Sequence, residues 1–387
     1  MQTRTLLFIM IGVTAFGSNL FGGLSAEIQK ACSLSLGQLS ALMSLSQVGT
    51  LLSFMLLPLL VRRLGPYLLM IVGIVGSAIG LLGMGLSRGA LSFTLFFLVQ
   101  AWLGYFYGTN SFSVLVLSDP ERKKTNIPVM HLLWSLASIG SGFYISLVKG
   151  DRWYLGFYQM ATVYLVMSAL FIAHIPEART MPQLFSSKGG RGSFLQSFSL
   201  LKQKSFRTFF LYLILFNAVE YCCTVYPLLY LQQNRGATGA QVGLSLSLLF
   251  AGSTASRFLV IPLANKAKNP VPLLFSLTIL GIFSTTLLVA APTLALGFVA
   301  MTLLGFSFGA LNPATQLLEV HTWPNDMTQI ANMHSVSMVF GRLTLPALIG
   351  LVSLHSSLRG ALVVLVISMM VALATLGAFV RLSSRSC

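Results

Sequence analysis

A few ionisable side chains lie deep within apolar segments of this sequence, and they are its first candidates for chemistry. Glu220 is the only acidic residue deep in any apolar segment, about twelve residues into a predicted helix over 208–231. At 1.5 Å per helical residue, its depth is about 18 Å. Arg342 lies about fourteen residues into a predicted helix over 328–353. Its depth of about 21 Å matches that of Glu220.

A carboxyl group at such a depth is suited to taking up and releasing a proton, and a guanidinium group to binding an anion. A charge at the centre of a membrane helix costs about 2.5–3.5 kcal/mol on insertion scales, so each one needs a reason. We predict that Glu220 is the proton-coupling residue and that Arg342 binds an anionic part of a solute or regulates Glu220. The alternative is a permanent structural ion pair. Arg257 lies nearer a helix end, where we interpret it as a snorkelling or helix-bridging residue.

Neutral polar side chains recur at helical spacing and are suited to hydrogen bonding with a solute. Asn217 lies one turn before Glu220, and Asn312, Gln316 and Glu319 share one helix face at i, i+4 and i+7. We predict solute binding by Asn217, Asn312, Gln316, Gln100, Tyr107, Asn19 and Gln47. Bonds between helices, worth about 0.6 kcal/mol each, are the alternative for each of them. Glu319 is close to a helix end, and we expect it to pair with a basic loop residue.

Other chemistry has little support in the sequence. The eight acidic residues show no metal-binding spacing, and no phosphate-binding loop motif is present. No metal-type CxxC pair occurs among the four cysteines, which are Cys32, Cys222, Cys223 and Cys387. We therefore expect neither an enzyme nor a cofactor. The net charge of +16 is scattered through short loops, so we expect no nucleic-acid binding.

The elements that position these residues must be membrane helices. Of the 387 residues, 55% are hydrophobic and only 8% are charged, whereas soluble domains carry roughly 25% charged residues. One spanning helix takes about 20 residues. Twelve apolar segments of this length predict helices over 5–26, 37–61, 66–86, 90–117, 127–148, 153–174, 208–231, 240–264, 270–290, 294–319, 328–353 and 359–381.

A long polar stretch divides the twelve segments into two groups of six. We predict an N-terminal bundle over 1–175, a basic cytoplasmic linker over 176–207 and a C-terminal bundle over 208–387. A short amphipathic helix is expected around Leu195–Leu201. If the N-terminus is cytoplasmic, sixteen Lys and Arg residues fall on the inner side and six on the outer side. Basic residues favour the cytoplasmic side, so we predict both termini inside. The sequence has no N-x-S/T glycosylation pattern, which favours a bacterial source and therefore an inner membrane.

The two halves repeat one another at nearly constant offsets. Pro58 and Pro66 recur as Pro262 and Pro270, shifted by 204 residues. The segment 103–108 recurs as 304–309, shifted by 201, and Met130-His131 recurs as Met333-His334, shifted by 203. Three ordered matches on either side of a basic linker indicate a duplication. Parallel six-helix repeats of this kind are a transporter architecture.

With this pattern the chain resembles the major facilitator superfamily over nearly its whole length. The loop Pro58-Leu-Leu-Val-Arg62-Arg63-Leu64-Gly65-Pro66 is similar to the family motif G-x-x-x-D-R-x-G-R. Arg63 and Gly65 match it, whereas Pro58 replaces Gly and Arg62 replaces the Asp that helps latch the two halves in the family. The resemblance implies an all-α protein of two pseudo-symmetric six-helix bundles, monomeric and working by alternating access. It also implies gating or structural roles for Arg62, Arg63 and Gly65.

Two departures separate the chain from typical drug/proton antiporters of that family. Their R-x-x-x-G motif is here Gln100-Ala-Trp-Leu-Gly104, and their G-x-x-x-G-P motif is here reduced to Gly140 and Gly142. The segment Asn126-Ile-Pro-Val-Met-His131 faintly resembles one in fucose-permease-like sugar symporters. We interpret His131 and His334 as residues that cap or brace helix ends.

The sequence thus predicts a secondary transporter driven by an ion gradient. We expect proton symport of a small polar or anionic organic solute by alternating access. The alternatives are efflux of an amphipathic compound by antiport and, in another class, a non-transporting sensor or scaffold with a transporter fold.

Overall fold

The computed structural model describes residues 3–119, 121–148, 150–185, 194–266 and 269–383. These residues form helices and connecting turns, and the described part of the chain contains no strand. The chain divides into two compact units, Met1–Gly190 and Arg191–Cys387. Residues 186–193 of the predicted linker over 176–207 lie outside the described residues, and so does Arg385, one of the basic residues counted for the topology prediction.

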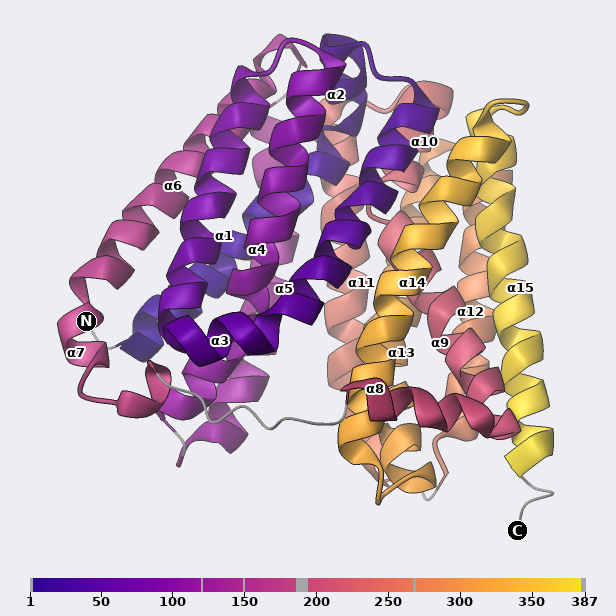
Figure 1. Cartoon of the computed structure of the whole chain (residues 1–387). Helices are drawn as coiled ribbons and strands as arrows, with labels where there is room; N and C mark the ends of the chain where they lie inside the picture. The colour runs from indigo at the N-terminus through magenta and orange to yellow at the C-terminus, as the bar shows by residue number, and fades with distance from the viewer. Residues whose placement is uncertain (1–2, 120, 149, 186–193, 267–268, 384–387) are drawn as a thin grey trace. The chain divides into compact units, whose positions relative to one another are not determined.

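The first unit consists of long helices joined by short turns (Figure 1). Its long helices are α1 Thr3–Gly23, α3 Leu36–Leu86, α4 Ala90–Ser118, α5 Lys123–Leu147 and α6 Tyr154–Ala173. The short helix α2 Ser25–Cys32 follows α1. The shorter elements are η1 Gly150–Arg152, α7 Ile175–Ala178 and η2 Pro182–Leu184. Helix α3 packs mainly against α4 and α6, and α1 packs against α5.

Helix α3 corrects the prediction of a loop between helices over 37–61 and 66–86. The helix continues through Arg62 and Arg63, and the only non-helical backbone in it is at Gly65, with φ 75° and ψ 160°. Glycine adopts this conformation readily, and Pro66 follows it because the first position of a helix needs no N–H group. The predicted boundary is therefore a single sharp kink. Gly65 is buried against the backbone of Phe185.

The second unit repeats the long-helix pattern. Its elements are α8 Phe194–Ser197, η3 Phe198–Lys202, α9 Lys204–Cys222, α10 Tyr226–Arg235, α11 Gly239–Lys266, α12 Val271–Ala290, α13 Leu294–Thr322, α14 Met327–Ser353 and α15 Leu358–Ser383. Helix α9 packs against α14 and α15, and α13 packs against α11 and α12. Helices α12 and α15 also pack together, and they thereby join the group of α9, α14 and α15 to the group of α11, α12 and α13.

The end of the predicted linker is structured and belongs to the second unit. The expected helix around Leu195–Leu201 falls in α8 and η3, which lie across one end of this unit (Figure 1). Two hydrogen bonds fasten the segment: Asn332 Nδ2 donates to Ser197 Oγ at 3.1 Å, and Trp323 Nε1 donates to Gln203 Oε1 at 3.3 Å.

The number of spans is consistent with twelve. Ten described helices are long and apolar enough to cross a membrane, and the bent pair α9 and α10 makes an eleventh span. One of the ten is α3, whose 51 residues contain two helical segments on either side of Gly65. The chain is therefore an all-α, multi-pass membrane protein.

Candidate functional site

Glu220 lies beside a break in its helix, which corrects the prediction of one continuous helix over 208–231. Helix α9 ends at Cys222 and α10 begins at Tyr226, with a bend of 43° between them. Pro227 in the first turn of α10 explains the break, because proline cannot donate to the Cys223 carbonyl and its ring clashes with it. Non-helical backbone at membrane depth is tolerated only inside protein or along a water-filled cavity. Glu220 therefore lies next to backbone that must be enclosed by protein or must line a water-filled cavity.

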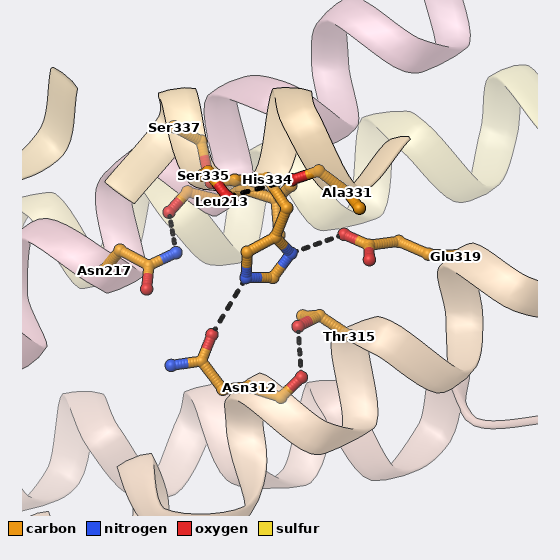
Figure 2. A network of polar contacts seen from close by, with 9 residues as sticks. All are labelled: Leu213, Asn217, Asn312, Thr315, Glu319, Ala331, His334, Ser335 and Ser337. Atoms are coloured by element: carbon orange, nitrogen blue, oxygen red, sulfur yellow. Dashed lines mark hydrogen bonds and ion pairs between the residues drawn. The ribbon is translucent and has the colours of Figure 1, made fainter. Parts of the chain in front are cut away.

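The Glu220 carboxylate is hydrogen-bonded to α13. Asn312 Nδ2 donates to Glu220 Oε2 at 3.1 Å. Asn312 immediately precedes Pro313, which lies inside α13. The sequence predicted that Asn312 shares a helix face with Glu319, and the structure turns this face toward α14 (Figure 2).

His334 of α14 extends this contact along α13. His334 Nε2 lies 3.2 Å from Asn312 Oδ1, and His334 Nδ1 lies 2.7 Å from Glu319 Oε1. His334 and Glu319 are both buried, at 6% and 4% exposure. Seven residues separate Asn312 from Glu319, a rise of about 10.5 Å along the helix, and the imidazole ring bridges it. We refer to Glu220, Asn312, His334 and Glu319 as the polar chain.

Two predicted roles change with this geometry. The expected partner of Glu319 was a basic loop residue, whereas its partner is His334 on the neighbouring helix. Glu319 is buried within the second unit, where it contacts His334. His334 was expected to cap a helix end, whereas it lies eight residues into α14 and is buried. Its repeat counterpart His131 is exposed.

Arg257 reaches the same region from α11. Arg257 Nε donates to the Gly309 carbonyl of α13 at 3.2 Å. This carbonyl is free within its own helix because residue 313, four positions later, is proline and has no N–H. Gly309 lacks a side chain where Ser253 of α11 approaches, so the two helices come close enough for this bond. The helix-bridging interpretation of Arg257 agrees with this contact.

Arg342 is held by an aromatic ring. Its guanidinium carbon lies 5.4 Å from the ring centroid of Tyr221, a cation–π contact. Arg342 Nε is buried and has no hydrogen-bond partner in the described structure. Arg342 and Arg257 both attract the Glu220 carboxylate electrostatically. The ion pairs within 4.0 Å in the described part of the chain include Arg4–Asp119, His174–Glu177 and His334–Glu319, and none of these three joins Arg342 to Glu220.

The other predicted solute ligands of this unit differ in their surroundings. Asn217 is fully buried, its Nδ2 donates to the Leu213 carbonyl at 2.8 Å, and its Oδ1 lacks a hydrogen-bond partner. Figure 2 shows Asn217 beside His334. Gln316 is exposed and does not contribute to the polar chain.

The predicted residues of the first unit lie in surroundings of a different kind. Asn19 is buried and its Nδ2 donates to Ser141 Oγ at 2.9 Å, which joins α1 to α5. Gln47 is buried and donates to Ser46 Oγ at 3.1 Å. Tyr107 is buried, and Gln100 packs its backbone against Gly80. Arg62 and Arg63 are exposed on α3.

The second unit therefore holds a hydrogen-bonded chain of two carboxyl groups, an amide and an imidazole, with two guanidinium groups close to its Glu220 end. Carboxylates and an imidazole in hydrogen-bond contact can exchange protons, and an unneutralised guanidinium group can bind an anion. No cluster of three or more potential metal ligands occurs among the described residues. Sequence reasoning missed Tyr221 and the link between Asn312 and His334. Only the shared face of Asn312 and Glu319 pointed toward that link.

Comparison with known proteins adds the family and the fold. The family model described as Major Facilitator Superfamily matches residues 7–333. The nucleoside transporter NupG, in a mutant form, superposes with a TM-score of 0.81 at 14% identity, covering 98% of this chain and 100% of that chain. A bacterial homolog of the human lysosomal transporter Spinster, in an inward-facing and occupied conformation, superposes with a TM-score of 0.80 at 13% identity. The match covers 98% of this chain and 96% of that chain. A search of curated proteins found no match.

Proposed function

Because this chain belongs to the Major Facilitator Superfamily, a family of transporters, we propose that it moves a small polar or anionic organic solute by proton-coupled symport. Alternating access brings the solute site to each side of the membrane in turn. Glu220 carries the coupling proton in this proposal. The lipid bilayer and the proton gradient are the other partners, and the working form is a monomer.

The observation that carries the proposal is the position of Glu220. The carboxylate lies beside a broken span and receives a hydrogen bond from Asn312. A buried carboxylate with an uncharged donor and two nearby guanidinium groups can exist both with and without a proton. Discontinuous helices of this kind form substrate and coupling-ion sites in transporters. This supports a coupling role for Glu220.

Arg342 supports an anionic or strongly polar solute. Its guanidinium group contacts the Tyr221 ring, and its Nε has no hydrogen-bond partner among the described residues. An acceptor oxygen of the solute would supply that partner. A hydroxyl or N–H group of the solute would supply a donor for Asn217 Oδ1, which also lacks a hydrogen-bond partner among the described residues. The low identity to NupG and to the Spinster homolog leaves the solute open, so nucleosides belong in a test panel beside carboxylates and sugars.

We place both termini in the cytoplasm because of the distribution of Lys and Arg. We place the protein in the inner membrane of a bacterium because the sequence has no N-x-S/T glycosylation pattern. In this orientation the Lys204 end of α9 lies on the cytoplasmic side.

The test is solute uptake into proteoliposomes, with the solute first chosen by thermal shift of the purified protein. With an alkaline lumen, the wild type should accumulate the solute. Glu220→Gln should lose accumulation but keep counterflow, because exchange needs no release of a proton. Glu121→Gln, which changes an exposed glutamate, should behave as wild type.

Each alternative gives a different result in these vesicles. An antiporter accumulates its compound when the lumen is acidic and not when it is alkaline. A sensor or scaffold binds the compound in the thermal-shift assay but shows no counterflow. Full accumulation by Glu220→Gln would show that Glu220 is a structural residue.

A further inference from the structure

His334 faces a hydrogen-bond acceptor on each of its two ring nitrogens. Nδ1 lies 2.7 Å from the carboxylate of Glu319, and Nε2 lies 3.2 Å from the amide oxygen of Asn312. Neither oxygen has a hydrogen to donate when Glu319 is ionised. Both contacts are therefore satisfied together only when both nitrogens of His334 carry a hydrogen, which is the imidazolium form.

The direction of the Asn312 amide is set by Glu220. The amide has one donating and one accepting end, and its Nδ2 donates to Glu220 Oε2 at 3.1 Å. Its oxygen is therefore the end that faces His334 (Figure 2). This arrangement suits an ionised Glu220, which can only accept.

Protonation of Glu220 reverses the direction in which the Asn312 amide must point. A protonated carboxyl group that donates to Asn312 needs the amide oxygen, so the amide turns about its side-chain axis and presents Nδ2 to His334. His334 Nε2 must then accept, and it can do so only without its hydrogen. His334 keeps the hydrogen on Nδ1 and its bond to Glu319.

We infer that Asn312 is a two-position switch that makes protonation of Glu220 and protonation of His334 mutually exclusive. The inference rests on the proposed function, in which Glu220 is the coupling residue. The proton count balances: Glu220 takes one proton from one aqueous side, and His334 releases one proton to the other. Each arrangement therefore holds a single exchangeable proton, and no proton crosses the amide itself.

The position of the chain in α13 gives this exchange a direction. Asn312 lies ten residues before the end of α13 at Thr322, and Glu319 lies only three residues before it. His334 and Glu319 are thus the part of the polar chain closer to the helix end that the Lys and Arg distribution places in the cytoplasm. Asn312 and His334 are positioning residues that connect this end to Glu220.

Several other charged groups surround the polar chain. Arg257 of α11 and Arg342 of α14 attract Glu220, and Asp326 lies half-buried at the start of α14. The remaining charged or titratable residues of the elements packed against α14 include these exposed ones: Lys202, Lys204, Arg207, His321, Arg359 and Arg381. Direct attraction between Glu220 and His334 also favours opposite protonation states, so the test must separate attraction from the switch.

The experiment measures the protonation of His334 by NMR of the purified full-length chain labelled with ¹⁵N-histidine. The His334 signal is assigned by its loss in His334→Gln. Wild type, Glu220→Gln, Asn312→Leu and the double variant are compared at the pH where half of wild-type His334 is doubly protonated. Glu121→Gln is the matched control.

The switch predicts a large effect of Glu220→Gln that depends on Asn312. The glutamine can donate as well as accept, so the direction of the amide is no longer fixed, and the ratio of doubly to singly protonated His334 should fall on the order of 10-fold. In the Asn312→Leu background the same change should have less than about a third of this effect.

Equal effects in the two backgrounds would show attraction alone and overturn the inference, and so would an unchanged ratio in Glu220→Gln. If Asn312→Leu does not fold, Asn312→Ala takes its place in the same comparison. The NMR result is independent of transport. A failure of Glu220→Gln to alter solute accumulation therefore rejects the proposed function, whereas equal NMR effects reject the switch.

Discussion

Arg342 is a cation beside the Glu220 carboxylate whose Nε is left without a hydrogen-bond partner among the described residues. Its guanidinium carbon lies over the Tyr221 ring, 5.4 Å from the ring centroid. Arg342→Ala should weaken the binding of an anionic solute by roughly 10-fold or more, the effect of one lost charge-assisted hydrogen bond. Arg342→Lys should recover only part of this, because an ammonium group lacks the planar fork.

Binding constants from ligand-induced thermal shifts check this prediction. Arg359→Ala, which removes an exposed arginine at the start of α15, is the matched control. An equal loss of affinity for neutral and anionic solutes would mean that Arg342 shapes the site without binding the anion.

The sequence predicted which residues of this region are chemically important but not how they meet. The depth of Glu220 and the shared face of Asn312 and Glu319 follow from helical spacing within one segment. The contact between Asn312 and His334 depends on the register of α13 against α14, which no spacing within either helix determines. For the same reason the sequence predicted that Glu319 pairs with a basic loop residue, although its partner is His334.

At the scale of elements, α11 and α13 are joined by a bond that a proline makes possible. Pro313 leaves the Gly309 carbonyl without its helical donor, and Arg257 supplies one. Arg257→Met should lower the melting temperature by a few degrees, because bonds between membrane helices contribute about 0.6 kcal/mol and at most about 1.7 kcal/mol.

A second substitution makes this explanation specific. In the Arg257→Met background, Pro313→Ala restores the backbone donor for Gly309 and should raise the melting temperature. The gain should be smaller when Arg257 is present, because the carbonyl is then already bonded. The same gain in both backgrounds would mean that Arg257 does not satisfy this carbonyl.

The kink in α3 gives a second test on an element. Gly65 has φ 75° and ψ 160°, and a Cβ there would collide with the backbone of Phe185. Gly65→Ala should destabilise the first unit by about 1–3 kcal/mol. Thermal unfolding in detergent measures this against Gly89→Ala, where φ is −159° and nothing lies within 4 Å. Similar melting temperatures for the two variants would contradict the prediction.

The break between α9 and α10 is a feature that the pattern of apolar residues does not predict. The run over 208–231 is apolar apart from a few polar side chains such as Asn217 and Glu220, so it predicted one helix, yet α9 and α10 are separate. Pro227 was the available signal, because its missing donor and its ring disrupt the turn that precedes it. Length and composition predicted the number of spans well, and local backbone chemistry decided where they break.

At the scale of the whole molecule, the distribution of Lys and Arg predicts both termini in the cytoplasm. A reporter that is active only in the periplasm should be inactive when fused after Cys387. The same reporter fused after Gly236, at the end of α10, should be active. Activity at Cys387 would reverse the topology and, with it, the direction assigned to proton release by His334.

The attachment of α8 and η3 to the second unit has a consequence for how the gene can be divided. Ser197 and Gln203 are bonded to Asn332 and Trp323, so the second unit begins in practice at Phe194 and not at the start of α9. Two separately translated fragments, 1–185 and 194–387, would keep the helix contacts described within each unit, including the two hydrogen bonds of Ser197 and Gln203. A cut after Gln203 would instead remove from the second fragment both hydrogen bonds, Asn332 to Ser197 and Trp323 to Gln203. Split expression of the first kind should therefore yield a reassembled carrier, and the second kind a poorly assembled one.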